Sequence, residues 1–340
     1  VPLGAPVATL PPVSNFVDDL VFAKLKTIGI PPSDIADDGT FIRRLTLDLA
    51  GRLPTASEMK DFMASKDANK RTALVDRLLD SPDYAEFFAN KWSALLRNQR
   101  TQPVYARGTY LFWQWIRDSI ADNKPYDQFV REVIAAAGDI DNSPPVAWYR
   151  QVKEQKQQME DVAQLFLGTR MQCAQCHHHP FEKWSQQDYY GFAAFFANVA
   201  RKPSTFTGEE LIYHKRGIAQ TQNIRTKEQV MPTSLGGAAL KLKPEQDPRV
   251  SLAEWMRAKD NPFFAHTLVN RYWKHFFNRG LVEPEDDMRE TNPPVNPELL
   301  SALAADFIKT GYDMKKLIRT IVTSTTYQLS AVPNAHNAKD

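Results

Sequence analysis

The stretch Ser14–Gly29, SNFVDDLVFAKLKTIG, contains the pattern that decides the fold class of the chain. Apolar residues recur in it every three to four positions from Phe16 to Leu25, which places them on one face of a helix. A serine precedes this pattern, and Gly29 with two prolines soon after it ends the pattern. Helix start and stop signals on both sides of one apolar face predict an amphipathic α-helix.

The same signals recur along most of the chain. Thr55 and Glu58 have the spacing of a capping box, and Ser185 with Asp188 has the same spacing ahead of a short aromatic segment. The 23 prolines against 14 glycines also suit helices that begin and end at proline. Further helices are expected near residues 38–50, 70–79, 109–121, 126–137, 151–169, 262–280, 297–311 and 313–326.

Two stretches lack this periodicity. Residues 139–150, DIDNSPPVAWYR, are expected to form a loop, and residues 201–248 are polar, irregular and long enough for a β-hairpin. We therefore predict a mostly α-helical protein, a multi-helix bundle in two helical parts. The expected domains are residues 13–200 and 249–330, joined by the irregular bridge at 201–248.

Charge and hydropathy narrow the classes of partner. The chain has 340 residues with 42 basic and 40 acidic side chains, a formal net charge of +2. Such a balance gives no broad basic surface for nucleic acid, so we expect no nucleic-acid partner. No apolar run approaches the roughly 20 residues that a membrane-spanning helix needs, and we expect no transmembrane segment. Residues 1–12 have the composition of a trimmed terminus, from which a signal peptide would already have been removed.

The strongest chemical signal is the segment RMQCAQCHHHPF at residues 170–181, which holds both cysteines of the chain. Two thiols separated by two residues can reach the two vinyl groups of one haem, and the next histidine then lies beneath the iron. The spacing C-x-x-C-H is the attachment signature of c-type haem. It predicts that Cys173 and Cys176 bind haem and that His177 is the metal ligand.

Other interpretations of this segment stay open. The cysteines and histidines could hold zinc or copper, or the segment could bind no cofactor. A thioredoxin-like redox pair is less favoured, because no strand pattern precedes the motif. His179 stands two residues beyond His177 and cannot easily reach the opposite face of the same iron, so we expect it to contact a propionate, a substrate or another metal. The candidates for a second axial ligand are His214, His266, His275, Met159, Met171 and Met231.

The predicted helix at residues 262–279 has a basic face. Arg271, His275 and Arg279 recur on it at four-residue spacing. Such a face could hold haem propionates or an anionic ligand, and it could equally be a solvated helix face. We predict that it turns toward the C-x-x-C-H segment and that Arg271 or His275 completes the site.

An acidic run follows this helix. Glu283, Glu285, Asp286 and Asp287 stand close to Arg289. Paired carboxylates of this kind suit general acid–base catalysis, but acidic runs are more often exposed loops. The sequence leaves both interpretations open.

Longer stretches around these motifs resemble a known pair of families. CAQCHHHPFEKWSQQDYYGFAAFFANV, at residues 173–199, resembles the cytochrome-like DUF1549 (PSCyt2) family of planctomycetes and related bacteria. Residues 261–330 resemble its habitual companion, DUF1553 (PSD1). The motif C-x-x-C-H-x-H-P-F of the first family falls on Cys173, Cys176, His177, His179, Pro180 and Phe181. The motif N-R-x-W-x-H-x-x-x-x-G falls on Asn270, Arg271, Trp273, His275 and Gly280.

The resemblance implies a periplasmic or extracellular protein in bacteria that degrade polysaccharides. Together with the motif it predicts a c-type haem redox protein, acting in electron transfer or haem-dependent oxidation, with a redox partner protein or a carbohydrate substrate. One alternative is a polysaccharide-active enzyme that uses a non-haem metal at the Cys/His cluster. Another is a carbohydrate-binding or assembly module without catalysis. The sequence does not decide whether the protein is an enzyme.

Overall fold

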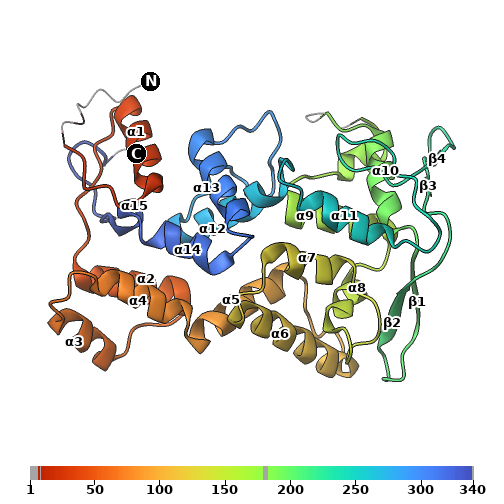
Figure 1. Ribbon diagram of the computed structural model, residues 1–340, viewed down its shortest axis with the longest axis horizontal. Helices are drawn as coiled ribbons and strands as arrows, with labels where there is room; N and C mark the ends of the chain where they lie inside the picture. Colours follow the sequence, from red (N-terminus) through yellow and green to blue (C-terminus); the bar gives the residue numbers. More distant parts are fainter. Residues whose placement is uncertain (1–6, 8, 179–182, 339–340) are drawn as a thin grey trace. The chain divides into compact units, whose positions relative to one another are not determined.

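The computed structural model describes residue 7, residues 9–178 and residues 183–338 of the chain (Figure 1). In that part of the chain, α-helices dominate and the strands form two small two-stranded sheets. The prediction of a mostly α-helical fold with a hairpin in the irregular bridge is confirmed. None of the helices in these residues combines the length and apolar character that crossing a lipid bilayer requires.

The chain folds into two compact units, each assembled from separate segments. Unit 1 comprises residues 1–88, 269–281 and 294–340. Unit 2 comprises residues 89–268 and 282–293. Because each unit includes segments from both sides of residues 201–248, neither unit coincides with a predicted domain. The division into domains at residues 200 and 249 stays a prediction.

Unit 1 is built from helices alone among its described residues. Its elements are α1 (Phe16–Ile28), α2 (Asp38–Ala50), α3 (Ala56–Ala64), α4 (Lys70–Leu79), the first part of α5 (Pro82–Leu95), the later part of α12 (Phe264–Phe277), α13 (Pro297–Lys309), α14 (Met314–Val322) and α15 (Thr325–Gln328). Apolar side chains from α1, α2 and α14, such as Val17, Leu45 and Ile318, are fully buried in it.

The ends of α1 show how local sequence and tertiary contacts combine. Its N-cap is Asn15, one residue after the serine that the sequence pattern suggested, and Gly29 ends it in the left-handed conformation at φ 71°. The buried carboxylate of Asp18 accepts hydrogen bonds from the backbone N–H groups of Thr325 and Thr326. One side chain in the first turn of α1 thus also caps α15, which ties the two ends of the chain together within unit 1.

Unit 2 contains helices, short 3₁₀ turns and all four strands. Its helices are the last part of α5, α6 (Ala106–Ala121), α7 (Tyr126–Ile134), α8 (Trp148–Gln151), α9 (Gln155–Leu167), α10 (Gln186–Ala193), α11 (Pro248–Met256) and the first turn of α12. Its 3₁₀ turns are η1 (Pro103–Tyr105), η2 (Pro144–Ala147), η3 (Gln172–Gln175) and η4 (Ala194–Phe196). Its strands are β1 (Val199–Pro203), β2 (Glu210–His214), β3 (Thr221–Gln222) and β4 (Gln229–Val230).

The irregular bridge is part of unit 2, where its strands form two hairpins (Figure 1). Strands β1 and β2 pair antiparallel, with Val199 opposite His214 and Pro203 opposite Glu210. Ile212 on β2 also exchanges two backbone hydrogen bonds with Gly138, at 2.8 and 3.0 Å. These bonds satisfy backbone groups that an isolated two-stranded ribbon would leave to water.

Two local predictions are wrong. Residues 139–150 are not all loop, because η2 and α8 occupy most of their second half. The two prolines suit a first helical turn, and burial of Trp148 and Tyr149 stabilises it. The single helix predicted for residues 313–326 is interrupted at Ser324, whose extended backbone and side chain cap the separate helix α15.

Candidate functional site

Cys173 lies on the 3₁₀ turn η3 in unit 2, and Cys176 is the residue that caps the end of this turn. A 3₁₀ helix has three residues per turn and Cys176 keeps a right-handed helical backbone, so the two cysteines, three residues apart, project from the same side. Both are free thiols and both are exposed. The exposed His177 follows directly, and its Nδ1 donates a hydrogen bond to the carbonyl oxygen of His178 at 2.6 Å. Two accessible thiols and an accessible imidazole are therefore grouped on one short turn.

Helix α9 leads into this turn and ends at Gly168. Gly168 has φ 60°, and a Cβ built there would lie 2.6 Å from Cγ of Met288 and 3.0 Å from Oγ1 of Thr267. Both the backbone conformation and the close packing require glycine at this position. The backbone N–H of Met288 also donates to the Gly168 carbonyl at 2.8 Å. Segment 282–293 is thus fastened to the end of α9, five residues before Cys173.

Asp286 provides a second attachment of the same segment. Its carboxylate pairs with Arg170 and accepts a hydrogen bond from Gln164. Burial on its own would raise the pKa of Asp286, but the hydrogen bonds from Arg170 and Gln164 outweigh it and hold this pKa below the usual value. The acidic run predicted from the sequence therefore contributes a structural clamp on the residues that precede the turn.

Helix α10, which follows the turn in the chain, also contacts it. Ser185 and Asp188 form the predicted capping box at its start. Its Gln186 donates through Nε2 to the Gln175 carbonyl at 3.0 Å, and its Tyr190 donates through the phenol to the same oxygen at 3.2 Å. One carbonyl between the two cysteines thus accepts hydrogen bonds from two side chains of α10.

Tyr189, the neighbour of Tyr190, has a different partner. Its phenol donates to Oε1 of Glu160 on α9 at 2.6 Å, and its ring lies 5.2 Å from the ring of Tyr190 in an edge-to-face arrangement. Burial, followed by the hydrogen bond to Glu160, raises the pKa of Tyr189. Burial, followed by the nearby Cys176 thiol, also raises the pKa of Tyr190. Both phenols therefore stay protonated at neutral pH.

Two buried aromatic-ring nitrogen atoms in unit 2 have no hydrogen-bond partner among the described residues. They are Nε1 of Trp184, seven residues after His177, and Nδ1 of His266 in the first turn of α12. The rings of Trp184 and Phe263 lie 6.1 Å apart, so the start of α12 lies near Trp184. Burial lowers the pKa of His266, which keeps this imidazole neutral at pH 7. Unsatisfied buried nitrogen atoms are uncommon in folded proteins and identify groups that a bound molecule could satisfy.

His275 belongs to a hydrogen-bonded network in unit 1. Its Nε2 donates to the Asp48 carbonyl at 2.8 Å, and its ring packs on Phe87 and Phe88. The carboxylate of Asp48 accepts from the Tyr327 phenol at 2.7 Å. Burial, followed by the Asp48 charge, raises the pKa of Tyr327. His275 thus has a defined structural position, and the prediction that it completes the C-x-x-C-H site stays a prediction.

The other residues singled out in the sequence differ in exposure. Arg271 is half-buried and Arg279 is exposed, both in unit 1, while Met159 and Met171 are completely buried in unit 2. His179 lies outside the described residues. Among the residues that the structure does describe, no three His, Cys, Asp or Glu side chains are grouped as a metal site.

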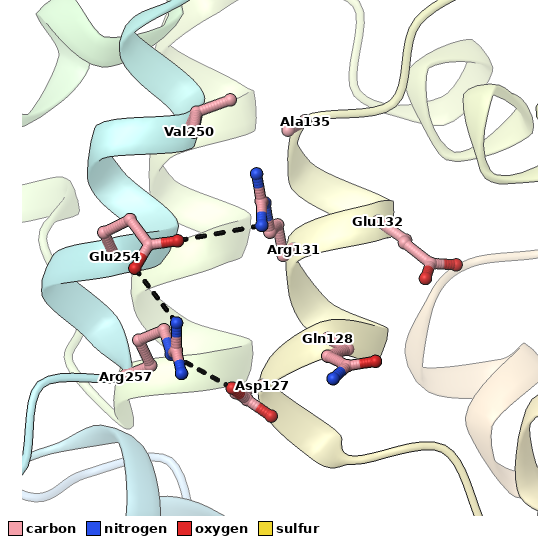
Figure 2. A pocket seen from close by; sticks show the side chains of 8 residues that line it. All are labelled: Asp127, Gln128, Arg131, Glu132, Ala135, Val250, Glu254 and Arg257. Carbon is pink, nitrogen blue, oxygen red and sulfur yellow. Dashed lines mark hydrogen bonds and ion pairs between the residues drawn. The ribbon is translucent and has the colours of Figure 1, made fainter.

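A cavity of about 490 Å³ lies between α7 and α11 in unit 2 (Figure 2). Its charged groups form a chain of ion pairs: Arg257 with Asp127 at 3.1 Å, Arg257 with Glu254 at 3.2 Å, and Glu254 with Arg131 at 3.7 Å. The fifth charged residue, Glu132, pairs with Lys124. These contacts favour a role in joining the two helices rather than in chemistry.

Comparison with family models shows to which family the chain belongs. The model of PSCyt2, described as a protein of unknown function (DUF1549), matches residues 16–201, more than half of the chain. The chain belongs to the PSCyt2 family. A second model, PSD1, described as a protein of unknown function (DUF1553), matches residues 248–340. No curated protein and no solved structure gives a significant match.

The PSCyt2 match covers the whole C-x-x-C-H turn and both helices that hold it. Neither family description names an activity, and neither describes its family as cytochromes. Sequence reasoning identified the cysteines and His177 but missed Gln186, Tyr190 and the role of Asp286. The capping box at Ser185 was the signal for α10, but only the folded chain shows that α10 contacts Gln175.

Proposed function

We propose that this PSCyt2 protein is an extracytoplasmic c-type haem protein that takes part in redox chemistry. One observation carries the proposal: Cys173 and Cys176 are free, exposed and on the same side of a formed turn, directly before the exposed His177. This is the donor set that covalent haem attachment uses, with two thiols for the vinyl groups and one imidazole for the iron.

The surroundings of the turn fit a haem in a second respect. Haem carries two carboxylates, which only accept hydrogen bonds when ionised. Trp184 has a buried indole N–H without a partner among the described residues, and it follows the turn closely in the chain. A carboxylate near it would remove the cost of an unsatisfied buried donor, which is about 1–3 kcal/mol.

In this proposal the residues of the chain have distinct roles. Cys173 and Cys176 would hold the haem, and His177 would be its axial ligand. Arg170, paired with Asp286, keeps the preceding backbone fixed to segment 282–293. When bound, the haem supplies a one-electron redox centre whose potential depends on its ligands and on the burial of its surroundings.

The link to polysaccharide breakdown and to the periplasm or the extracellular space rests on the family resemblance. A redox partner protein or a carbohydrate would then be the second reactant. Six-coordinate iron would favour electron transfer, and an open axial position would favour oxidation of a substrate.

The test is an absorption spectrum with a pyridine haemochrome assay on protein produced in a cell-envelope compartment that matures c-type cytochromes. We expect one covalently bound haem per chain. The matched control is the Cys173→Ala, Cys176→Ala double variant expressed in the same cells, which should carry none. Both exposed thiols can be replaced without opening the core.

Elemental analysis of the same preparation separates the haem proposal from the non-haem alternative. Iron equal to the porphyrin content supports the proposal. Stoichiometric zinc or copper without porphyrin would contradict it and favour a metal held by the Cys/His cluster.

A further inference from the structure

The turn that carries the cysteines is closed more weakly at Cys176 than at its start. Its closing hydrogen bond, from the Cys176 N–H to the Cys173 carbonyl, is 3.5 Å long, which is beyond the usual range for such bonds. The preceding bond, from the Ala174 N–H to the Met171 carbonyl, is 2.9 Å long. The part of the turn between the two cysteines therefore needs support from elsewhere.

That support converges on the Gln175 carbonyl. This oxygen belongs to the last residue of η3, where a short helix leaves its carbonyl groups without backbone partners. It accepts hydrogen bonds from Nε2 of Gln186 at 3.0 Å and from the phenol of Tyr190 at 3.2 Å. A carbonyl oxygen has two lone pairs, so these two donors satisfy it fully. Fixing this oxygen also fixes the peptide that joins Gln175 to Cys176.

The two donors are well placed to act as rigid supports. Gln186 and Tyr190 lie on the same helix, four residues apart, so their side chains project from one face of α10. Both residues are buried, and the capping box of Ser185 and Asp188 fixes the start of α10. Burial keeps the Tyr190 phenol protonated and able to donate.

We propose that Gln186 and Tyr190 are positioning residues for covalent attachment: by holding the Gln175 carbonyl, they keep both thiols on one side of the turn before the cofactor arrives. This inference rests on the proposed haem function. Without the two hydrogen bonds, the Gln175–Cys176 peptide can rotate, and Cys176 leaves the arrangement in which both thiols meet the same porphyrin edge. The first thioether bond would then form without the second.

The experiment counts thioether bonds in the Gln186→Leu, Tyr190→Phe and double variants, produced in the same envelope compartment as the wild type. The α-band of the pyridine haemochrome and the number of thiols that can still be alkylated report whether one or two bonds have formed. We expect two bonds in the wild type. The fraction with a single bond should rise about fivefold for each lost hydrogen bond, and further in the double variant.

Tyr189→Phe is the matched control, because it removes one phenol of equal burial that bonds to Glu160 and not to the turn. It should keep the wild-type ratio of one to two bonds. The same ratio in the double variant as in the wild type would overturn the proposal while leaving the haem function intact. An equal rise in Tyr189→Phe would also overturn it, since general loosening of α10 would then be the cause.

A second measurement tests the positioning without any haem. Amide hydrogen exchange at Cys176 in the haem-free protein should accelerate about fivefold in Gln186→Leu and in Tyr190→Phe and stay unchanged in Tyr189→Phe. If the wild type binds no haem, the proposed function fails, and this exchange result alone then decides whether the two side chains position the turn. Unchanged exchange in the double variant would show that they do not.

Discussion

The turn around Cys173 in unit 2 and the second half of α12 in unit 1 both carry histidine motifs, and they use their polar groups differently. At the turn, the thiols and His177 are exposed, while buried side chains behind them hold the backbone. On α12, His275 itself is hydrogen-bonded to Asp48 and packed on two phenylalanine rings. A motif whose reactive atoms stay accessible can bind a cofactor or a substrate. A motif whose imidazole is already hydrogen-bonded and packed stabilises the fold.

Removal of the two exposed thiols should have the greatest consequence. The Cys173→Ala, Cys176→Ala double variant should lose all covalent haem, and in haem-free protein it should be as stable as the wild type, because both side chains are exposed. Haem content measures the first effect, and thermal unfolding of haem-free wild type and variant measures the second. A large loss of stability would show that the cysteines are structural, and our separation of the two regions would fail.

Loss of the His275 side chain should mainly lower stability. His275→Ala should lower the free energy of unfolding by about 2–4 kcal/mol, because it leaves a gap between Phe87 and Phe88 and an unpaired carbonyl at Asp48. Urea unfolding measures this, with the exposed His178→Ala as the control that should change little. We expect an unchanged iron spectrum. An altered spectrum with unaltered stability would instead make His275 the second axial ligand.

Tyr327→Phe tests the hydrogen-bonded network around His275 and Asp48. It leaves the Asp48 carboxylate without its phenol donor and should cost about 1–3 kcal/mol. Burial and the Asp48 charge raise the pKa of Tyr327 above its usual 10.0, so the wild type should lose stability as pH rises beyond 10.0, where the unfolded phenol ionises first. The variant should lack this component of the loss. Tyr213→Phe, at a residue exposed on β2, is the control for both measurements.

Asp286 should contribute least to stability among these residues. Asp286→Asn weakens the pair with Arg170 and should cost about 1 kcal/mol at neutral pH. Because hydrogen bonds hold the pKa of Asp286 below 3.8, this contribution is present above that pH and is lost as pH falls below it. The stability difference between wild type and variant should therefore shrink in acid. A difference that is equal at pH 7 and below pH 3 would contradict the clamp, and Glu290→Gln, at an exposed ion pair, is the control.

The sequence predicted most helix ends correctly, because capping is a local property. Thr55 and Ser185 each cap the helix that their pattern indicated. The wrong predictions fall where tertiary contacts decide the outcome. Burial of Trp148 turns an expected loop into a helix, and Ser324 divides an expected single helix where Tyr327 packs into unit 1.

In the candidate site, too, local features were predictable from the sequence and tertiary contacts were not. The reactive groups were predictable from spacing, since C-x-x-C-H is contiguous in the sequence. Their supports were not, because Gln186 and Tyr190 contact Gln175 from 11 and 15 residues away and Asp286 reaches Arg170 across 116 residues. Nothing in the spacing of these residues indicates which carbonyl or charge they will meet.

The proposed function requires that Cys173 and Cys176 carry a covalently bound haem. The most direct test is the intact mass of the protein matured in an envelope compartment, followed by peptide mapping of the segment that contains both cysteines. We predict the added mass of one haem on that segment, with neither thiol open to alkylation. A protein of unmodified mass, folded and with both thiols alkylated, would contradict the account.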